Sequence, residues 1–260
     1  MAAKEQSFFS KHIIVSTFFI ILSMLTAGLL AGAAYLLPFI KENDSLAAGL
    51  SALFYLSFSL IFAKLLAHYC FRSTLNDFRI RLTVPKIRWL IIGFLLPVFV
   101  LGSLYLLGGK LSLNSLSWGT LAMGSLAAPI VEEIFFRGFL MTLFEIKYSR
   151  TIAVLVPSLI FALLHLLNGS LDFLMTGQLI IAGLSFSALL SYSVYETNSI
   201  TDSVLIHAFW NFFTLLFTFS NSSFLFGGRY GIDISPVAVL AYVLALLIIY
   251  LFRTSDKKKA

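Results

Sequence analysis

The sequence predicts an all-α, polytopic membrane protein with about eight transmembrane helices. Hydrophobic residues make up 59% of the 260-residue chain and charged residues only 12%, whereas about a quarter of the residues in soluble domains are charged. Eight segments contain no Asp, Glu, Lys or Arg, and each is about the ~20 residues that a helix needs to span a hydrocarbon core. They are apolar throughout, which favours helices over the alternating strands of a barrel. The eight segments are 13–40, 45–63, 89–109, 111–131, 151–171, 173–195, 203–228 and 234–252.

The basic residues predict the orientation, because Lys and Arg resist translocation and stay on the cytoplasmic side. With the N-terminus inside, only Lys41, Lys110 and Arg229 fall in external segments. Both termini are therefore expected in the cytoplasm, and the spans without a long eukaryotic targeting extension fit a bacterial plasma membrane. The net charge of +6 is explained by this distribution and by contact with membrane lipid, so no nucleic-acid partner is expected. The basic residues of the cytoplasmic segments are Lys4, Lys11, Arg72, Arg79, Arg81, Lys86, Arg88, Lys147, Arg150, Arg253, Lys257, Lys258 and Lys259.

The two ends of the chain are expected to support and anchor the protein. Residues 1–110 contain helices one to three, which carry almost no polar residues inside their spans and predict a scaffold. Lys64 lies close enough to the inner end of the second helix for its stem to reach the interface. The basic loop from Arg72 to Arg88 is expected at the cytoplasmic headgroups. Residues 222–260 predict an eighth helix and a basic cytoplasmic tail. The single cysteine, Cys70, excludes an internal disulfide and a thiolate metal cluster.

Ionisable groups enter the spans between residues 111 and 221, which are therefore expected to form the catalytic core with helices four to seven. Insertion scales put an Asp, Lys or Arg at a helix centre at about 2.5–3.5 kcal/mol, so a cluster of ionisable groups there indicates function. Glu133 and Arg137 of the fourth helix are i,i+4 neighbours and can neutralise each other. Glu132 points about 100° away around the helix, which leaves it free to act as a general base. Pro129 removes a backbone hydrogen bond one turn earlier and is expected to open room for water.

The fifth and seventh helices add two histidines and an asparagine. His165 and Glu132 are equally far along the chain from the cytoplasmic turn at 148–149, so an antiparallel hairpin places them at one depth. His207 and Asn211 share a face of the seventh helix, but are expected about 10 Å shallower at 1.5 Å per residue. We therefore expect the fourth helix to tilt or to overhang at the cytoplasmic side.

Two kinds of chemistry fit these residues. In the first, Glu132, His165 and His207 hold a divalent metal, with zinc the expected ion, and an open position holds a water molecule. In the second, Glu132, assisted by His165, deprotonates water directly, while His207 and Asn211 donate hydrogen bonds to the oxyanion. Both routes hydrolyse a peptide bond. The HExxH motif of soluble metalloproteases is absent, so the sequence leaves both routes open.

The three motifs resemble those of the CPBP (Abi) family, which includes type II CAAX prenyl proteases and bacterial bacteriocin-processing and self-immunity proteins. The matching residues are Glu132, Glu133 and Arg137 for EExxxR, Phe161 and His165 for FxxxH, and His207 and Asn211 for HxxxN/D. Asn198 stands where a glycine is frequent in the family. The resemblance covers roughly residues 114–215. It implies that Glu132 is the catalytic carboxylate, that Glu133 and Arg137 support it, and that His165, His207 and Asn211 complete the site.

These residues predict an intramembrane endopeptidase that hydrolyses a membrane-associated peptide or protein. The resemblance suggests a prenylated C-terminus, a bacteriocin leader or a signalling peptide, and the sequence does not choose among them or predict an oligomeric state. The alternative is a non-catalytic membrane immunity or scaffold protein that binds a peptide or a sensor partner, and dependence on Glu132 discriminates the two. A proton-coupled transporter is disfavoured, because no pair of interrupted helices recurs in matching halves of the chain.

Overall fold

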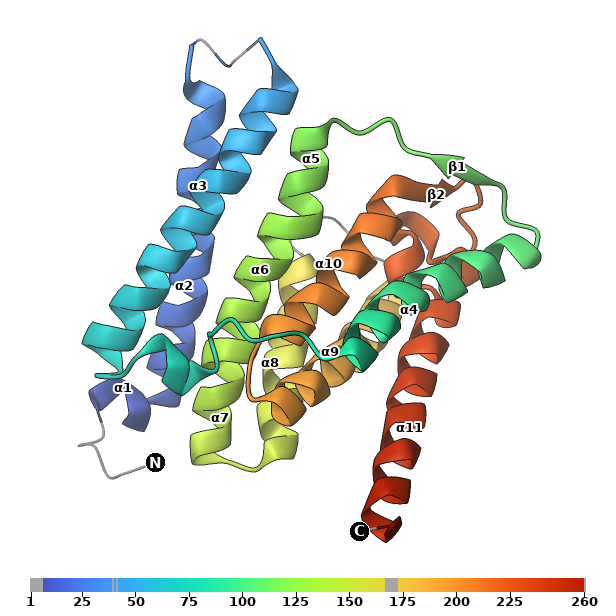
Figure 1. Ribbon diagram of the computed structural model, residues 1–260. Helices are drawn as coiled ribbons and strands as arrows, with labels where there is room; N and C mark the ends of the chain where they lie inside the picture. Colours follow the sequence, from blue (N-terminus) through green and yellow to red (C-terminus); the bar gives the residue numbers. More distant parts are fainter. Residues whose placement is uncertain (1–6, 39, 41, 167–172, 260) are drawn as a thin grey trace.

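The computed structural model describes residues 7–38, 40, 42–166 and 173–259, with side chains described as far as Leu251. It shows a nearly all-α integral membrane protein with 81% of its residues in helices (Figure 1). Four helical segments are long and apolar enough to cross a membrane, and two more apolar helices are shorter. The predicted fold class is confirmed, but the number of eight spans is not. The four long segments are Ile13–Leu36, Asp44–Cys70, Ile87–Leu106 and Phe173–Thr197, and the shorter two are Arg150–His165 and Pro236–Leu251.

The N-terminal part is a helical hairpin. After α1 (Phe8–Lys11), α2 (Ile13–Ala31) continues into the 3-10 turn η1 (Gly32–Leu36), and α3 (Asp44–Leu65) continues into the π-helical η2 (Leu66–Cys70). Figure 1 shows α2 and α3 side by side along the edge of the molecule. Large apolar side chains on these helices are exposed, as Ile14 and Leu29 are, which fits contact with lipid. Lys4 and Lys41, used to predict the topology, lie outside the described residues.

The basic loop before α4 (Ile87–Leu106) is hydrogen-bonded to a distant helix–helix turn of the chain. It contains the 3-10 turn η3 (Leu75–Phe78) and then runs along the turn between α9 (Phe173–Thr197) and α10 (Thr201–Leu216). Backbone groups and hydroxyls of that turn bond the loop along its length, including Ile200 N–H to the Arg79 carbonyl at 3.0 Å and the Ser199 hydroxyl to the Arg81 carbonyl at 2.7 Å.

The helix that carries the acidic motif begins later and runs longer than the apolar run 111–131 predicts. Leu111–Leu113 form strand β1 instead, and the helix begins at Trp118 behind the N-cap Ser117. From there the chain stays helical to Lys147 through two π-helical segments. These elements are α5 (Trp118–Ala122), η4 (Met123–Ala127), α6 (Ala128–Glu133), η5 (Ile134–Leu140) and α7 (Met141–Lys147).

The helix accommodates Pro129 through a π-helical segment on its N-terminal side. Proline has no N–H for the ladder, and η4 directly precedes α6, in which Pro129 is the second residue. Wider π-helical turns accommodate such interruptions without ending the helix, and they occur often at functional sites. Glu132 and Glu133 lie at the end of α6, between the two π-helical segments.

The prediction of one helical span over 203–228 is wrong. Helix α10 ends at Leu216, and strand β2 (Phe217–Phe219) pairs antiparallel with β1. The chain then makes the 3-10 turns η7 (Phe224–Phe226), η8 (Gly228–Tyr230) and η9 (Ile232–Ile234) before α11 (Pro236–Lys259). Gly227, Gly228 and Gly231 have positive φ angles of 85°, 59° and 75°, a conformation that glycine adopts without a steric cost. Strand pairing and glycine turns therefore replace the last part of the predicted helix.

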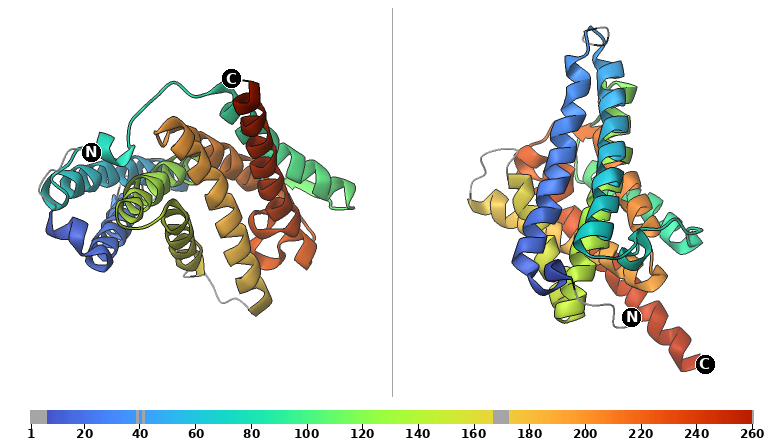
Figure 2. Two further views of the ribbon diagram at one scale, coloured as in Figure 1. Left: turned by 90° about the horizontal axis from the view of Figure 1, so that it is seen from below. Right: turned by 90° about the vertical axis from the view of Figure 1, so that its left-hand side faces the viewer.

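The positions of the α7–α8 and α9–α10 turns agree with the sequence predictions. The turn between α7 and α8 (Arg150–His165) lies at Tyr148 and Ser149, where the sequence places it. This turn extends beyond the α9–α10 turn in Figure 1 and in the right-hand view of Figure 2, so the expected overhang is present. The end of α11 and helix α1 lie at the same end of the molecule. That arrangement is required for both termini to be cytoplasmic, which stays a prediction.

Candidate active site

The six candidate residues come together from four helical elements. Glu132, His165, His207 and Asn211 line one cavity of about 290 Å³, while Glu133 and Arg137 are buried. Glu132 and Glu133 come from α6, Arg137 from η5, His165 from α8, and His207 and Asn211 from α10. Helix α10 packs against α6 and η4, so the expected depth difference does not separate these residues.

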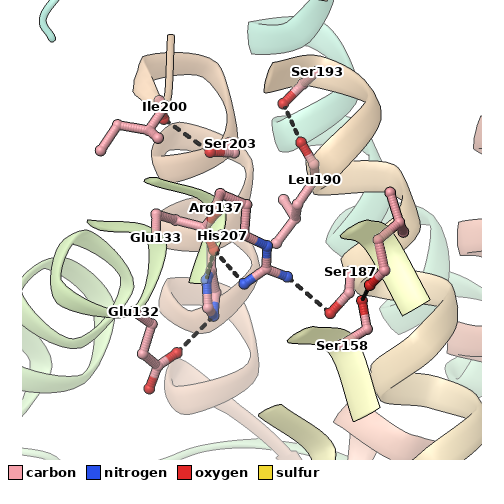
Figure 3. A network of polar contacts seen from close by, with 11 residues as sticks. Glu132, Glu133, Arg137, Ser158, Ser187, Leu190, Ser193, Ile200, Ser203 and His207 are labelled. Atoms are coloured by element: carbon pink, nitrogen blue, oxygen red, sulfur yellow. Dashed lines mark hydrogen bonds and ion pairs between the residues drawn. The ribbon is translucent and has the colours of Figure 1, made fainter. Parts of the chain in front are cut away.

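Glu133 and Arg137 form a buried polar network with His207 (Figure 3). Oε1 of Glu133 lies 3.0 Å from a guanidinium nitrogen of Arg137 and 3.0 Å from Nδ1 of His207. Another Arg137 nitrogen donates to the hydroxyl of Ser187 at 2.8 Å. Side chains of Glu133 and Arg137 are only 0% and 3% exposed. Because the same oxygen of Glu133 contacts both Arg137 and Nδ1 of His207, the buried pair holds His207 in one orientation.

Glu132 is the carboxylate that remains available. Its Oε2 lies 3.6 Å from Nε2 of His207, and its side chain is 20% exposed. No Lys or Arg forms an ion pair with Glu132 among the described residues. In Figure 3, Glu132 approaches His207 from the side opposite Arg137. Two adjacent glutamates therefore have different surroundings, one closed into the protein and one facing the cavity.

His165 is oriented by its own helix. Its Nδ1 lies 2.8 Å from the carbonyl oxygen of Phe161, one turn earlier. The Phe161 ring packs against the His165 ring with centroids 4.5 Å apart, and the Arg137 guanidinium lies 5.2 Å from the centroid of Phe161. The i,i+4 spacing of the second motif thus places one aromatic ring between the histidine and the buried arginine. Nε2 of His165 has no hydrogen-bond partner among the described residues, and His165 lines the cavity.

Asn211 is fixed by the π-helical segment η4. Its Nδ2 donates to the carbonyl of Gly124 at 2.9 Å. A carboxamide nitrogen carries two hydrogens, so one N–H of Asn211 remains available on the cavity side. No sequence motif indicates Gly124 as a partner, because the contact depends on how α10 packs against η4.

The zinc site expected from Glu132, His165 and His207 stays a prediction. The described residues contain no group of three or more His, Cys, Asp or Glu side chains arranged to hold a metal ion. The donor types suit zinc, and each histidine has its Nδ1 held by another group, as zinc-binding histidines usually do. Glu132 and His207 approach each other, and His165 lines the same cavity.

A second cavity of about 190 Å³ lies beside the first. Both cavities are lined by Glu132, Phe161 and His165, so these side chains stand where the two meet. The remaining wall of the second cavity is apolar and includes Met24 and Leu25 of α2. The N-terminal hairpin therefore contributes to the surroundings of the site and is more than a remote scaffold.

Two polar residues near the site lie outside the three sequence motifs. Ser187 of α9 bonds Arg137, and Asp233 of η9 lines the larger cavity. A small hydroxyl in an apolar helix is common and does not stand out in a sequence. Asp233 lies in a segment that the hydropathy pattern places between two spans, so no depth argument connects it to Glu132.

The comparison with known families agrees with these motifs. Residues 114–213 match the model of the Rce1-like family, described as type II CAAX prenyl endopeptidase Rce1-like. This range contains all six candidate residues and lies inside the core predicted at 111–221. No curated protein sequence matches the chain. The matched family implies intramembrane protease activity of the CAAX type. Over residues 114–213, this integral membrane protein is therefore similar to the Rce1-like family, consistent with the CPBP family that its three motifs resemble.

Proposed function

We propose that this protein is an intramembrane endopeptidase in which Glu132 activates water to hydrolyse a peptide bond of a membrane-associated peptide or protein. The contrast between the two adjacent glutamates carries the proposal. Glu133 is fully buried against Arg137 and His207, whereas Glu132 faces the cavity 3.6 Å from Nε2 of His207. A cavity-facing carboxylate beside an oriented histidine has the geometry of a general base with an electrostatic partner.

The reaction uses groups that are already oriented. Glu132 takes a proton from a water molecule, and the hydroxide oxygen forms a bond to the carbonyl carbon of the substrate. His207 donates Nε2–H to the resulting oxyanion, and Asn211 donates its second amide hydrogen. The C–N bond then breaks, and the proton held by Glu132 passes to the leaving amine. His165 orients the water through Nε2.

The two adjoining cavities support a substrate that passes the catalytic groups as an extended chain. Glu132 and His165 lie between the cavities, so the scissile bond sits where they meet, with one part of the substrate in each. The apolar wall formed by α2 in the smaller cavity suits a segment that arrives from the lipid. The chemistry of the walls favours a membrane-associated chain over a soluble one.

A zinc-dependent route is tested by removing metal ions. The water-activation step above is derived without a metal, because the proposed ligands are not gathered into a metal-binding group in the described residues. We expect purified protein to retain its activity in the presence of a strong zinc chelator. Loss of activity that added Zn²⁺ restores would instead assign Glu132, His165 and His207 to a zinc site.

The function is tested by comparing membrane peptides and new protein termini, by mass spectrometry, in cells that carry native protein or Glu132→Gln at equal levels. Glu42→Gln is the matched control, because Glu42 is exposed and lies outside the motifs. We expect a set of termini that native protein and the Glu42 variant share and that Glu132→Gln lacks. Identical profiles, with Glu132→Gln still rescuing a deletion strain, would favour a non-catalytic immunity or scaffold protein.

A further inference from the structure

The larger cavity extends beyond the motif residues to a carboxylate outside the matched domain. Asp233 lies in η9, in the connection between β2 and α11 (Figure 1). Its neighbours Ile232 and Ile234 are buried, whereas Asp233 itself is exposed and lines the cavity with Glu132 and His207. The fold-back of this connection therefore places a second acidic side chain in the proposed active-site cavity.

The contacts of Asp233 fix its position without neutralising it. Its Oδ1 accepts a hydrogen bond from Nε1 of Trp210 at 2.7 Å, and Thr214 also bonds the carboxylate. Among the described residues, it forms no ion pair with Lys or Arg, and the basic groups in its electrostatic range are His165 and His207. Desolvation raises the pKa of Asp233, and the hydrogen bonds of Trp210 and Thr214 oppose that effect. A carboxylate that lines a cavity and has no Lys or Arg partner there is stabilised by a cation that enters the cavity.

Much of the wall of this cavity is apolar. Leu179, Ala182 and Phe186 of α9 line the cavity, as do Leu215 and Ile234. A lysine or arginine side chain has an apolar stem and a charged head, which match a largely apolar cavity that also contains a carboxylate. A C-terminal carboxylate would be repelled there by Asp233.

We propose that Asp233 makes the larger cavity a subsite for a lysine or arginine side chain of the substrate, near the scissile bond. This inference rests on the proposed peptidase function and adds a substrate class to it. Substrates held at this subsite have a Lys or Arg residue at a fixed number of residues from the cleaved bond. Asp233 contacts the substrate and selects it, while Glu132 performs the hydrolysis.

The test uses full-length protein in lipid vesicles and a library of lipid-anchored peptides of random sequence. Mass spectrometry of the products gives the residues around each cleaved bond. We expect native protein to enrich Lys or Arg about tenfold or more at one position, and Asp233→Glu to retain this preference. In Asp233→Asn, the ratio of cleavage after basic and neutral residues at that position should fall about tenfold, and Asp233→Arg should favour Asp or Glu. Cleavage by native protein without a basic preference, or an equal loss for basic and neutral peptides in Asp233→Asn, would overturn the proposal.

A binding measurement separates this proposal from the peptidase function. The same library, carrying a photoreactive group, is crosslinked to Glu132→Gln and to Glu132→Gln/Asp233→Asn, neither of which needs to cleave it. Preferential capture of Lys- or Arg-containing peptides by the single variant, lost in the double variant, supports the subsite even if native protein cleaves nothing. Equal capture by both variants overturns the subsite even if native protein is an active peptidase.

Discussion

At the scale of single residues, the site depends on adjacent glutamates with opposite surroundings. Glu133 bonds two buried basic side chains, while Glu132 faces the cavity. Removing one member of a buried ion pair leaves the other without compensation and costs about 3–5 kcal/mol. Removing a partly exposed carboxylate leaves no such group behind. The two side chains therefore differ in what they contribute to stability.

We expect Glu132→Gln and Glu133→Gln both to abolish activity, but only Glu133→Gln to lower stability strongly. The reason is that Arg137 and His207 lose their shared partner only in the second variant. Thermal unfolding in detergent, followed alongside peptide cleavage, measures both effects. Equal destabilisation by the two substitutions would contradict the separate roles.

Asn211 provides a test of oxyanion stabilisation. One of its amide hydrogens is used by the Gly124 carbonyl, and the proposal assigns the other to the oxyanion. Loss of one oxyanion donor lowers kcat by about 10²–10³ in other enzymes. We expect Asn211→Ala to lower kcat by that order with little change in KM. A rise in KM with unchanged kcat would instead assign Asn211 to substrate binding.

At the scale of elements, the α9–α10 turn explains why a glycine is frequent where this chain has Asn198. The backbone of Asn198 has a φ angle of 52°, in the left-handed region that glycine enters freely and asparagine more readily than most residues. Its Oδ1 also accepts a hydrogen bond from Nε of Arg79 at 3.2 Å. The side chain of Asn198 thus adds a contact with the basic loop to those that Ser199 and Thr201 make.

The effect of a substitution at Asn198 on stability should depend more on whether the new residue tolerates a positive φ angle than on whether it is polar. We expect Asn198→Gly to remain close to native stability, and Asn198→Val to lose about 1–2 kcal/mol, because a left-handed conformation costs about that much for residues with a Cβ atom. Chemical unfolding of both variants in the same detergent measures the difference. Equal losses would show that the contact with Arg79 dominates.

The approach of α3 to α5 depends on Gly119. A Cβ atom at this position would lie 1.9 Å from the backbone oxygen of Ser45, a distance that backbone atoms cannot relieve locally. Gly102 of α4 has nothing within 4 Å of the same point and is the matched control. We expect Gly119→Ala to lower the melting temperature and Gly102→Ala to keep or raise it, since Ala is favoured over Gly in helices by about 0.5–1 kcal/mol. An unchanged melting temperature in Gly119→Ala would mean that α3 and α5 can move apart at little cost in stability.

At the scale of the whole molecule, the sequence predicts the parts that depend on helix geometry. The i,i+4 motifs and equal distances from the turn are local consequences of an antiparallel hairpin, so Glu132 and His165 were expected together and line the same cavities. Strand pairing between β1 and β2 joins segments about a hundred residues apart, and hydropathy cannot distinguish those apolar strands from helix. Asp233 reaches the cavity through the same fold-back. Its position depends on tertiary contacts, which the hydrophobic periodicity of the sequence does not reveal.

The orientation of the molecule in the membrane gives the last prediction. The basic residues place the α7–α8 turn in the cytoplasm and the β1 side outside, and these features lie at opposite ends of the structure (Figure 1). Lys110 precedes β1 and is exposed, as is Ser149 in the α7–α8 turn. In a Cys70→Ser background, we expect Lys110→Cys to react with a membrane-impermeant maleimide on intact cells and Ser149→Cys to react only after permeabilisation. The reverse pattern would place Glu132 and its cavity in the opposite orientation and would direct the search for substrates to the other face of the membrane.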